Sequence, residues 1–446
     1  MFGLITTTRV RERAEGVFYG WWVVSGAFGI QVLLSALLMQ SFGAYAPILQ
    51  EQFGWSKAQL SAAFSMQRVE SGLLGPLQGW LLDRFGPRNV MRVGMLIFGI
   101  GLMTFSLVNS LTTFYLVFLL IAIGGSLGGF MSLTSTLVNW FVRRRATAMG
   151  VAQMGMSVGG LLVPVVAISL TDFGWRNTAF YSGVIVLLVG LPITQLMRRN
   201  PEEYGLLPDG ETHEEAALRR QRDRAAQRED PDDINFSPKQ AVRTRAFWFI
   251  SLGHGASVLV VSAVMVHLIV HLNEGLGYSL RAAATVVSLM TVMQMIGLPI
   301  GGFLGDRFEK RKIAIFAMFG HAAALIVLAY ATNLGMVIFF AVVHGLAWGM
   351  RGPLMQAMRA DYFGRRAFAK VMGFSSMIVM IGMTSGPLVA GIMADRLGNY
   401  QLGFTVLGVA AGLGSIFFIF ATKPQPPAPQ PAGEPLPGNL DLSPAD

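Results

Sequence analysis

The feature that most limits what this chain can fold into is a succession of twelve apolar segments of about 20 residues, separated by short polar turns. A helix of that length crosses the hydrocarbon core of a bilayer and makes its backbone hydrogen bonds internally. Charged residues are 13% of the chain, about half of the roughly 25% typical of soluble domains. The sequence therefore predicts an all-α membrane protein with twelve transmembrane helices. The expected spans run approximately over 19–41, 58–81, 89–108, 112–139, 146–170, 177–197, 247–271, 282–304, 313–331, 335–358, 369–393 and 401–421.

A charged turn occurs twice in equivalent places. Gly79–Arg88 reads GWLLDRFGPR and joins the second span to the third. Gly302–Arg311 reads GFLGDRFEKR, lies 223 positions later and joins the eighth span to the ninth. A long-range repeat of this kind indicates an internal duplication. We therefore expect two pseudo-symmetric six-helix bundles.

The composition of the remaining segments sets the expected domain boundaries. Residues 198–245 are polar, charged and interrupted by proline, and the end of the chain is rich in proline and cannot bury a core. The predicted parts are a cytoplasmic N-terminus at 1–18, an N-terminal bundle at 19–197, a cytoplasmic linker at 198–245, a C-terminal bundle at 246–423 and a disordered cytoplasmic tail at 424–446.

The distribution of basic residues predicts the orientation. With the N-terminus inside, 28 of the 34 Lys and Arg residues fall on the inner side and 4 on the outer side. Arg68 and Arg351 remain within spans. Both termini are therefore expected in the cytoplasm, in a multi-pass protein of the inner or plasma membrane. The same distribution explains the net charge of +9 without nucleic acid as a partner.

The repeated Asp-Arg turn resembles the signature loop of the major facilitator superfamily. Asn139–Gly155, NWFVRRRATAMGVAQMG, is similar to the fifth-helix signature of its monocarboxylate porter and oxalate/formate antiporter-like branch, and Gly20-Trp21-Trp22 resembles that branch's first-helix signature. The resemblance implies a central cavity between the bundles and rocker-switch alternating access. Carriers of this branch usually place an arginine in the eighth span and can use a lysine in the first, and this chain has neither.

Three residues whose side chains are charged at neutral pH lie deep within the predicted spans. A charge at bilayer depth is costly unless it is paired or faces water, so it marks a functional site by default. Arg351 in the tenth span is a candidate clamp for a carboxylate, because a guanidinium offers a planar fork of donors. Arg68 is a possible second substrate charge, and Glu70 a possible proton-coupling group. The alternative for each is a structural ion pair with a neighbouring helix.

Polar and aromatic residues at similar depth complete the predicted substrate site. Gln67 lies next to Arg68, and Tyr45 and Trp348 are deep enough to line a cavity. His267 shares a helix face with His271 and is a candidate for substrate hydrogen bonding or proton relay. For any single histidine, packing with a satisfied hydrogen bond is the favoured alternative.

The repeated turn also supplies the predicted gating residues. Asp83 and Arg84, with their counterparts Asp306 and Arg307, lie at the expected cytoplasmic edge of the membrane. We expect them to latch neighbouring helices in one state of the transport cycle, with Asp361 as a further gating candidate. Helix capping and topology anchoring are the alternative roles.

These features predict a secondary active transporter rather than an enzyme. The expected substrate is a small organic anion, with a monocarboxylate favoured, moved by proton symport or anion exchange. The alternative is an exporter or facilitator of a neutral or cationic solute such as a drug or a sugar, and a non-transporting receptor or scaffold ranks third. The protein is expected to act as a monomer in the lipid bilayer. No cofactor or metal is expected, and the absence of cysteine excludes thiol chemistry and disulfides.

Overall fold

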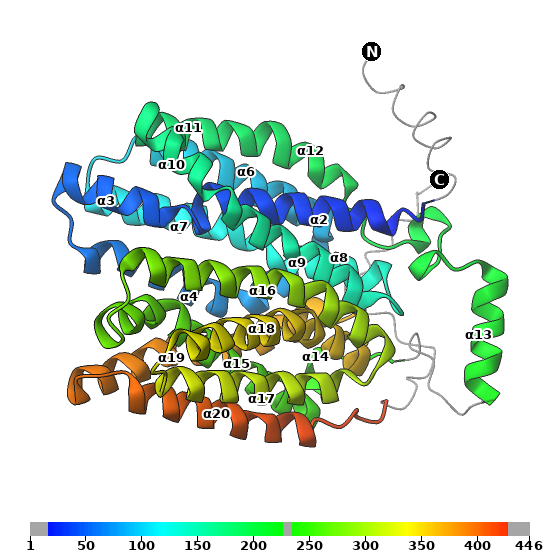
Figure 1. Ribbon diagram of the computed structural model, residues 1–446. Coiled ribbons are helices and arrows are strands. Elements are labelled where there is room, and N and C mark those ends of the chain that lie inside the picture. The colour runs from blue at the N-terminus through cyan, green and yellow to red at the C-terminus, as the bar shows by residue number, and fades with distance from the viewer. Residues whose placement is uncertain (1–16, 226–233, 427–446) are drawn as a thin grey trace, which may run out of the picture.

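A computed structural model describes residues 17–225 and 234–426 of the chain. The described chain is almost entirely helical and forms two layers of antiparallel helices, one from each half of the sequence (Figure 1). The predicted all-α fold is therefore confirmed. Most of the predicted N-terminal segment and of the predicted tail lie outside the described residues.

The helices of the first half form the N-terminal bundle. Several of its spans are built from two consecutive helices that share a direction. Its elements are α2 (Gly20–Leu34), the π-helical η1 (Ser35–Met39), α3 (Phe42–Phe53), α4 (Lys57–Leu73), α5 (Gly75–Phe85), α6 (Pro87–Phe105), α7 (Leu111–Gly128), α8 (Phe130–Trp140), α9 (Arg145–Leu161), α10 (Val163–Asp172), α11 (Trp175–Ile185), η2 (Val186–Gly190), α12 (Leu191–Ile193) and η3 (Thr194–Leu196).

The second half forms the C-terminal bundle from longer, less interrupted helices. These are α15 (Arg245–Val270) with η6 (His271–Gly275), α16 (Leu280–Arg307), α17 (Lys310–Ala329), α18 (Leu334–Phe363), α19 (Phe368–Leu397) and α20 (Gln401–Phe420). The linker contributes η4 (Glu202–Tyr204), η5 (Pro208–Gly210), α13 (His213–Ala225) and α14 (Pro238–Arg243). We call the end of the bundles that carries the linker the linker end, and the opposite end the far end.

The local sequence explains where helices begin and end. The α4 helix begins with a capping box, in which Ser56 and Gln59 each bond the other's backbone N–H. Its continuation α5 stops at Gly86, whose φ of 76° suits a residue without a Cβ, and Pro87 then starts α6. The predicted turn of the first repeat is therefore a sharp reversal between two helices.

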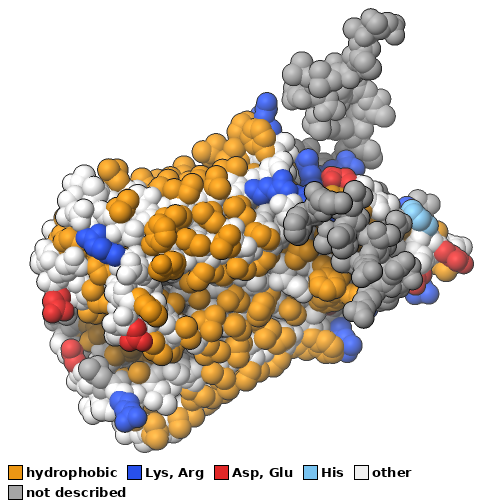
Figure 2. All heavy atoms as spheres, turned by 90° about the horizontal axis from the view of Figure 1, so that it is seen from above, with side chains coloured by type: hydrophobic (Ala, Val, Ile, Leu, Met, Phe, Trp, Pro, Cys, Tyr) orange, Lys and Arg blue, Asp and Glu red, His pale blue; other side chains and the backbone are white. Residues whose placement is uncertain are grey.

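Eleven helical segments within the described residues are long and apolar enough to cross a membrane. The segment formed by α4 and α5 is the twelfth, and it is more polar than the others because it carries Gln67, Arg68, Glu70 and Gln78. The outer surface shows a wide band of apolar side chains with charged groups gathered at its two ends (Figure 2). The protein is a multi-pass integral membrane protein.

Two helices run furthest past the ends that the apolar pattern predicts. The first span was expected to end near residue 41, but α3 continues the helix to Phe53 and stops at Gly54. The tenth was expected to end at 358, but α18 runs to Phe363. Good helix formers occupy the last turns, Gln50, Glu51 and Gln52 in α3 and Arg359 and Ala360 in α18, so backbone hydrogen bonding continues past the end of the predicted span. As a result, Arg359 lies inside a helix and is buried in the bundle rather than at the surface.

The two bundles contact each other through two helix pairs that occupy equivalent positions in the internal repeat. Helix α5 packs against the start of α19, and its counterpart α16 packs against the start of α9. A Cβ on Gly79 would lie 2.6 Å from the carbonyl oxygen of Ala369, and a Cβ on Gly302 would lie 2.7 Å from the Cα of Thr147. The repeated glycines therefore allow the backbones of opposite bundles to touch at the linker end.

Candidate functional site

Arg351 lies in the middle third of α18 and is 1% exposed. Its Nε and Nη1 atoms are buried and have no hydrogen-bond partner among the described residues. Among the residues that the structure describes, no carboxylate lies within ion-pairing distance of the Arg351 guanidinium. A buried guanidinium without a counter-charge is costly, so the site favours an anion that supplies acceptors to these donors.

A second buried arginine lies eight residues further along the same helix. Arg359 donates from Nε and Nη2 to the Ser375 hydroxyl at 3.0 and 2.8 Å, and from Nη1 to the Met355 carbonyl at 2.9 Å. Its Nη2 also lies 3.1 Å from Nδ1 of His254 in α15. Charge repulsion acts between Arg359 and Arg351. The interior of this bundle therefore carries two guanidinium groups, of which Arg351 has donors left over.

Glu70 is the buried carboxyl group of the opposite bundle. Its Oε2 accepts hydrogen bonds from the hydroxyls of Ser71 at 3.1 Å and Ser126 at 2.8 Å, so α4 is joined to α7. Gln67, one turn earlier, is buried as well, whereas the side chain of Arg68 lies outside the described part of the structure. The hydroxyl partners of Glu70 can serve either a charged or a protonated carboxyl group.

The other predicted substrate residues lie in different surroundings. Tyr45 is completely buried, its ring packs against Phe105 with centroids 5.8 Å apart, and its hydroxyl is one of the buried atoms without a partner among the described residues. Both ring nitrogens of His267 have partners, the Tyr400 hydroxyl at 3.1 Å and the Pro387 carbonyl at 2.9 Å. Trp348 is half-buried on α18. The contacts of His267 are those of a packed side chain, whereas the hydroxyl of Tyr45 has no hydrogen-bond partner in the described part of the chain.

The repeated aspartates both bind the start of a helix in the opposite bundle. Asp306 accepts hydrogen bonds from the backbone N–H groups of Ala146 at 2.8 Å and Thr147 at 2.9 Å, in the first turn of α9. Asp83 forms an ion pair of 3.1 Å with Lys370, in the first turn of α19. The sequence duplication extends to the partners, because Thr147 and Lys370 are also 223 positions apart. Each carboxylate also faces the positive end of a helix dipole.

Asp361 forms a third connection between the bundles at the linker end. One carboxylate oxygen accepts a hydrogen bond from Arg145 of α9, and the other lies 2.8 Å from the Lys310 ammonium of α17. The two arginines of the repeated turn do not join this network. Arg307 lies over the ring of Phe303 at 3.9 Å, and Arg84 lies over Trp80 at 5.6 Å, in cation–π contacts.

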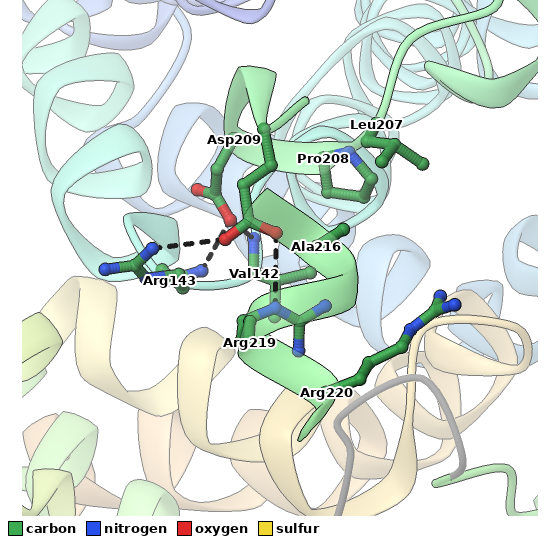
Figure 3. Close-up of a pocket in the computed structure, with 9 residues that line it drawn as sticks. Val142, Arg143, Leu207, Pro208, Asp209, Ala216, Arg219 and Arg220 are labelled. Atoms are coloured by element: carbon green, nitrogen blue, oxygen red, sulfur yellow. Dashed lines mark hydrogen bonds and ion pairs between the residues drawn. The ribbon is translucent and has the colours of Figure 1, made fainter. Parts of the chain in front are cut away.

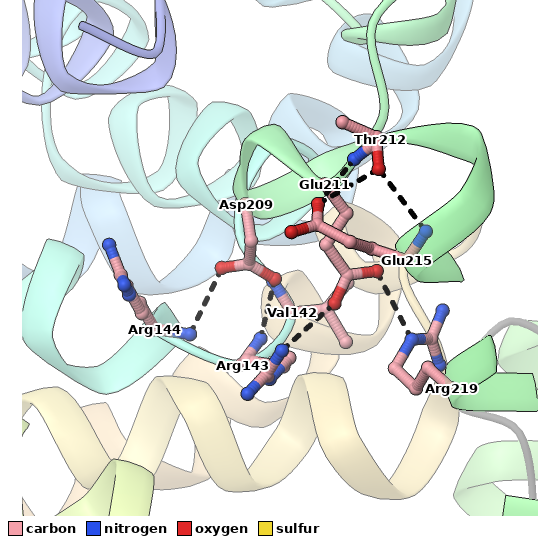
Figure 4. Close-up of polar contacts among 8 residues, drawn as sticks. All are labelled: Val142, Arg143, Arg144, Asp209, Glu211, Thr212, Glu215 and Arg219. Atoms are coloured by element: carbon pink, nitrogen blue, oxygen red, sulfur yellow. Dashed lines mark hydrogen bonds and ion pairs between the residues drawn. The ribbon is translucent and has the colours of Figure 1, made fainter. Parts of the chain in front are cut away.

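The first part of the linker is fixed to the N-terminal bundle through two carboxylates, those of Asp209 and Glu211. Asp209 accepts hydrogen bonds from the backbone N–H groups of Val142 at 3.0 Å, Arg143 at 2.8 Å and Arg144 at 3.1 Å, in the turn between α8 and α9 (Figure 4). Glu211 lies between the guanidinium groups of Arg143 and Arg219, at 3.1 and 3.2 Å. The linker thus binds the turn between α8 and α9, which is directly followed by Arg145 at the start of α9.

A small hollow lies between this turn and helix α13, with the side chains of Arg219 and Arg220 along one wall and Leu207 and Pro208 along another (Figure 3). At the start of α13, backbone and side-chain hydrogen bonds from Thr212 lower the pKa of Glu215. Glu215 therefore stays ionised and caps the helix that lines the hollow.

Several interacting residues were not singled out by the sequence. Arg145 and Lys370 look like topology anchors because they belong to basic clusters at span ends, and Arg359 looks like one because the apolar pattern stops before it. An unbroken run of helix-forming residues through Arg359 is the one signal that could have placed it inside a helix. Among the described residues, no group of three His, Asp or Glu side chains is placed to hold a metal ion.

Comparison with known proteins places the chain among transporters. It matches the family described as Major Facilitator Superfamily over residues 28–286 and 250–444. It is 24% identical to a probable sulfoacetate transporter of Cupriavidus necator, over 87% of this chain and 93% of that protein. It is 26% identical to mouse monocarboxylate transporter 11, over 90% and 87% of the two chains. The crystal structure of the human organic anion transporter MFSD10 superposes with a TM-score of 0.69 at 16% identity, covering 90% of this chain and 99% of that one.

Proposed function

Because this chain belongs to the major facilitator superfamily, whose members are transporters and not enzymes, we propose that it moves a small organic anion across the membrane by alternating access. The favoured substrate is a monocarboxylate or a similar small acid. Proton symport and anion exchange are the two proposed modes of coupling.

The observation that carries this proposal is the unpartnered guanidinium of Arg351. A guanidinium is charged at every physiological pH, and a buried N–H group without an acceptor loses roughly 1–3 kcal/mol of hydrogen bonding with water. Arg351 leaves two such nitrogens unpaired in a site that is 1% exposed. A carboxylate or sulfonate supplies both the opposite charge and the acceptors. Two of the relatives are named for anions of this kind, sulfoacetate and monocarboxylates.

The contacts at the linker end support the proposed transport cycle. Asp83, Asp306 and Asp361 hold the bundles together there, and each must release its partner for that end to open. We propose that the linker end is cytoplasmic, as the basic residues predict, and that this arrangement is the state closed to the cytoplasm. Arg84 and Arg307 would then anchor the two repeated turns through their aromatic contacts.

The remaining predicted site residues keep proposed roles in the two bundles. Glu70 is the proposed proton-binding group of the N-terminal bundle. On the same helix, Gln67 is proposed as a polar group of the substrate path and Arg68 as a second substrate charge. Trp348 is proposed to line it from α18. The two hydrogen bonds of His267 favour support of the bundle over direct contact with substrate, whereas the unpartnered hydroxyl of Tyr45 keeps its proposed place in the substrate site.

Uptake into proteoliposomes tests the proposed function. Labelled pyruvate, L-lactate and sulfoacetate should accumulate, whereas glucose and tetraethylammonium should not. Arg351→Lys keeps the charge but loses the planar fork, so anion affinity should fall by about 10- to 150-fold, and Arg351→Gln should bind none of the three.

Thermal stability measured on the same variants separates binding from structure. If Arg351 only held the bundle together, Arg351→Gln would melt at a lower temperature while its folded fraction still bound anions normally. That result would reject the clamp. Uptake of glucose or tetraethylammonium in place of the anions would instead support the alternative, a carrier of neutral or cationic solutes.

A further inference from the structure

Four buried polar atoms without a hydrogen-bond partner belong to two neighbouring helices of the C-terminal bundle. Among the described residues, the buried side-chain atoms without a hydrogen bond include Nε2 of His321, Nε2 of His344 and both Nε and Nη1 of Arg351. His321 belongs to α17, and the other two residues belong to α18, which packs against it. Unsatisfied groups are rare in protein interiors, so a cluster of them calls for a ligand or a function.

The two histidines form a direct pair. Their Nδ1 atoms are 3.1 Å apart, their ring centroids are 4.6 Å apart, and both side chains are 0% exposed. Two bare Nδ1 atoms at that distance would repel each other, so one ring carries the Nδ1 proton and donates it to the other. The donating ring then has a bare Nε2, which is one of the unpartnered atoms. The pair has an open position for one further proton.

Arg351 is placed so that its charge acts on this pair. It follows His344 by seven residues, nearly two full turns, so the two side chains lie on the same face of α18. Side chains on a helix lean toward its N-terminus, which brings the guanidinium back toward His344. Electrostatic repulsion from Arg351 reaches both His321 and His344.

We propose that the His321–His344 pair is a second proton-binding site, in the C-terminal bundle, that it binds the proton moved with the anion, and that its occupancy is controlled by the charge on Arg351. The inference rests on the proposed function, in which an anion binds Arg351. An anion at Arg351 cancels the positive charge beside the pair, so a proton can then bind the bare Nε2. The imidazolium so formed donates its Nδ1 hydrogen bond to the partner ring more strongly. Anion and proton binding thus favour each other reciprocally.

Few other charges can perform this role. Helix α20, which packs along α17, carries no titratable side chain. The remaining titratable groups on the surrounding helices are Arg145 in α9, Arg245, His254 and His267 in α15, His271 and Glu274 in η6, Arg281, Asp306 and Arg307 in α16, Lys310, Arg311 and Lys312 in α17, Arg359, Asp361 and Tyr362 in α18, and Lys370, Asp395 and Arg396 in α19. Of these, the groups of α16 and the basic residues of α17 lie at helix ends, whereas Arg351 lies within the same bundle interior as the pair.

A measurement without substrate tests the charge linkage. Histidine resonances of the isotopically labelled protein in detergent are followed by NMR from about pH 5 to 8, and the pair is assigned by its loss in His321→Gln and His344→Gln. In Arg351→Gln, the proton affinity of the pair should rise by about 5- to 150-fold, whereas Arg351→Lys should leave it unchanged. Equal titration in the parent and in Arg351→Gln would overturn the proposal. If Arg351→Gln does not fold, the parent with and without saturating pyruvate gives the same comparison.

Proton flux tests the coupling itself. Proteoliposomes containing a pH-sensitive dye receive a gradient of pyruvate, L-lactate or sulfoacetate. The parent should take up about one proton with each anion, and His321→Gln and His344→Gln should move none while still exchanging internal for external anion. His213→Gln, in the exposed linker helix, is the matched control and should behave as the parent.

The failures of the two proposals differ. If none of the three anions binds the parent, the proposed function fails. The NMR comparison of Arg351→Gln and Arg351→Lys still measures how the charge at position 351 affects the proton affinity of the histidine pair. If anions bind and the histidine variants keep the parental proton flux, the proton site lies elsewhere. Loss of proton flux in Glu70→Gln alone would assign it to the N-terminal bundle and overturn the inference.

Discussion

The carboxylate of Asp306 in the C-terminal bundle accepts a 2.9 Å hydrogen bond from the backbone N–H of Thr147 in the N-terminal bundle. An aspartate of one bundle thereby caps a helix of the other, and it does so from the position where the internal repeat places its counterpart Asp83 against Lys370. Since a cap of this kind is made across the interface, it can hold only while the linker end is closed. The repeated turn is in this way a conformational contact as well as a helix end.

Asp306→Asn should shift the protein toward the state open at the linker end, because an amide accepts fewer hydrogen bonds than a carboxylate and lacks its charge. Losing a helix cap costs about 0.5–2 kcal/mol, which shifts a two-state population by roughly 2- to 30-fold. Leu298 is a buried residue of α16 whose carbonyl group faces Gly150 of α9. A cysteine placed there should then react faster with a thiol reagent, in a chain that has no cysteine of its own. Asp395→Asn at the far end is the control. Parental labelling rates in Asp306→Asn would mean that the cap does not bias the cycle.

Asp361→Asn should lower the melting temperature and speed inactivation at the same time. The substitution strands the buried guanidinium of Arg145 and weakens the contact with Lys310. Because Asp361 is itself 30% exposed, we expect a loss of about 1–3 kcal/mol rather than the larger cost of a fully buried pair. Arg145→Gln combined with Asp361→Asn should recover part of the stability in a double-mutant cycle. Strict additivity of the two substitutions would show that the pair contributes nothing.

Gly302→Ala should destabilise the closed linker end, since the new methyl group would lie 2.7 Å from the Cα of Thr147. Overpacking of this kind costs typically about 1–3 kcal/mol. Gly43→Ala is the matched control, because nothing lies within 4 Å of a Cβ there. Alanine in place of a helical glycine should stabilise that site by about 0.5–1 kcal/mol. Melting temperatures in detergent should therefore move in opposite directions, and a shared direction would contradict the close backbone contact.

Asp209→Ala should release the linker from the N-terminal bundle, because three backbone N–H groups lose their common acceptor. Asp209→Asn should have a smaller effect, since asparagine keeps one acceptor and tolerates the left-handed backbone at φ 60°. Proteolysis in the linker should be faster for Asp209→Ala than for Asp209→Asn. Equal cleavage of both variants and the parent would show that the carboxylate does not fix the linker.

Cysteine labelling tests the proposed orientation. Leu218 in the linker helix is 55% exposed, and Leu107 in the turn between α6 and α7 at the far end is 70% exposed. A membrane-impermeant thiol reagent should label Leu107→Cys in intact cells and reach Leu218→Cys only after lysis. The reverse pattern would place the linker outside.

The sequence alone predicted the spans, the duplication and the family, because hydropathy and repeated motifs are properties of consecutive residues. It also placed Arg351, Glu70 and the two repeated aspartates at positions where charge requires an explanation. The sequence could not predict the partners of these groups. Asp306 meets Thr147 across a sequence separation of 159 residues, and Arg145 meets Asp361 across 216.

The tertiary structure decided those partners through the way the helices pack. Whether a buried guanidinium finds a carboxylate, a hydroxyl or no acceptor depends on which helices lie beside it and how each is rotated, and neither is encoded in local periodicity. Arg359 contacts Ser375 and His254, and His321 contacts His344. Nε and Nη1 of Arg351 have no acceptor among the described residues. Each outcome follows from the packing of α15, α17, α18 and α19 around a shared interior, where every polar group must be satisfied by a neighbour or by a ligand.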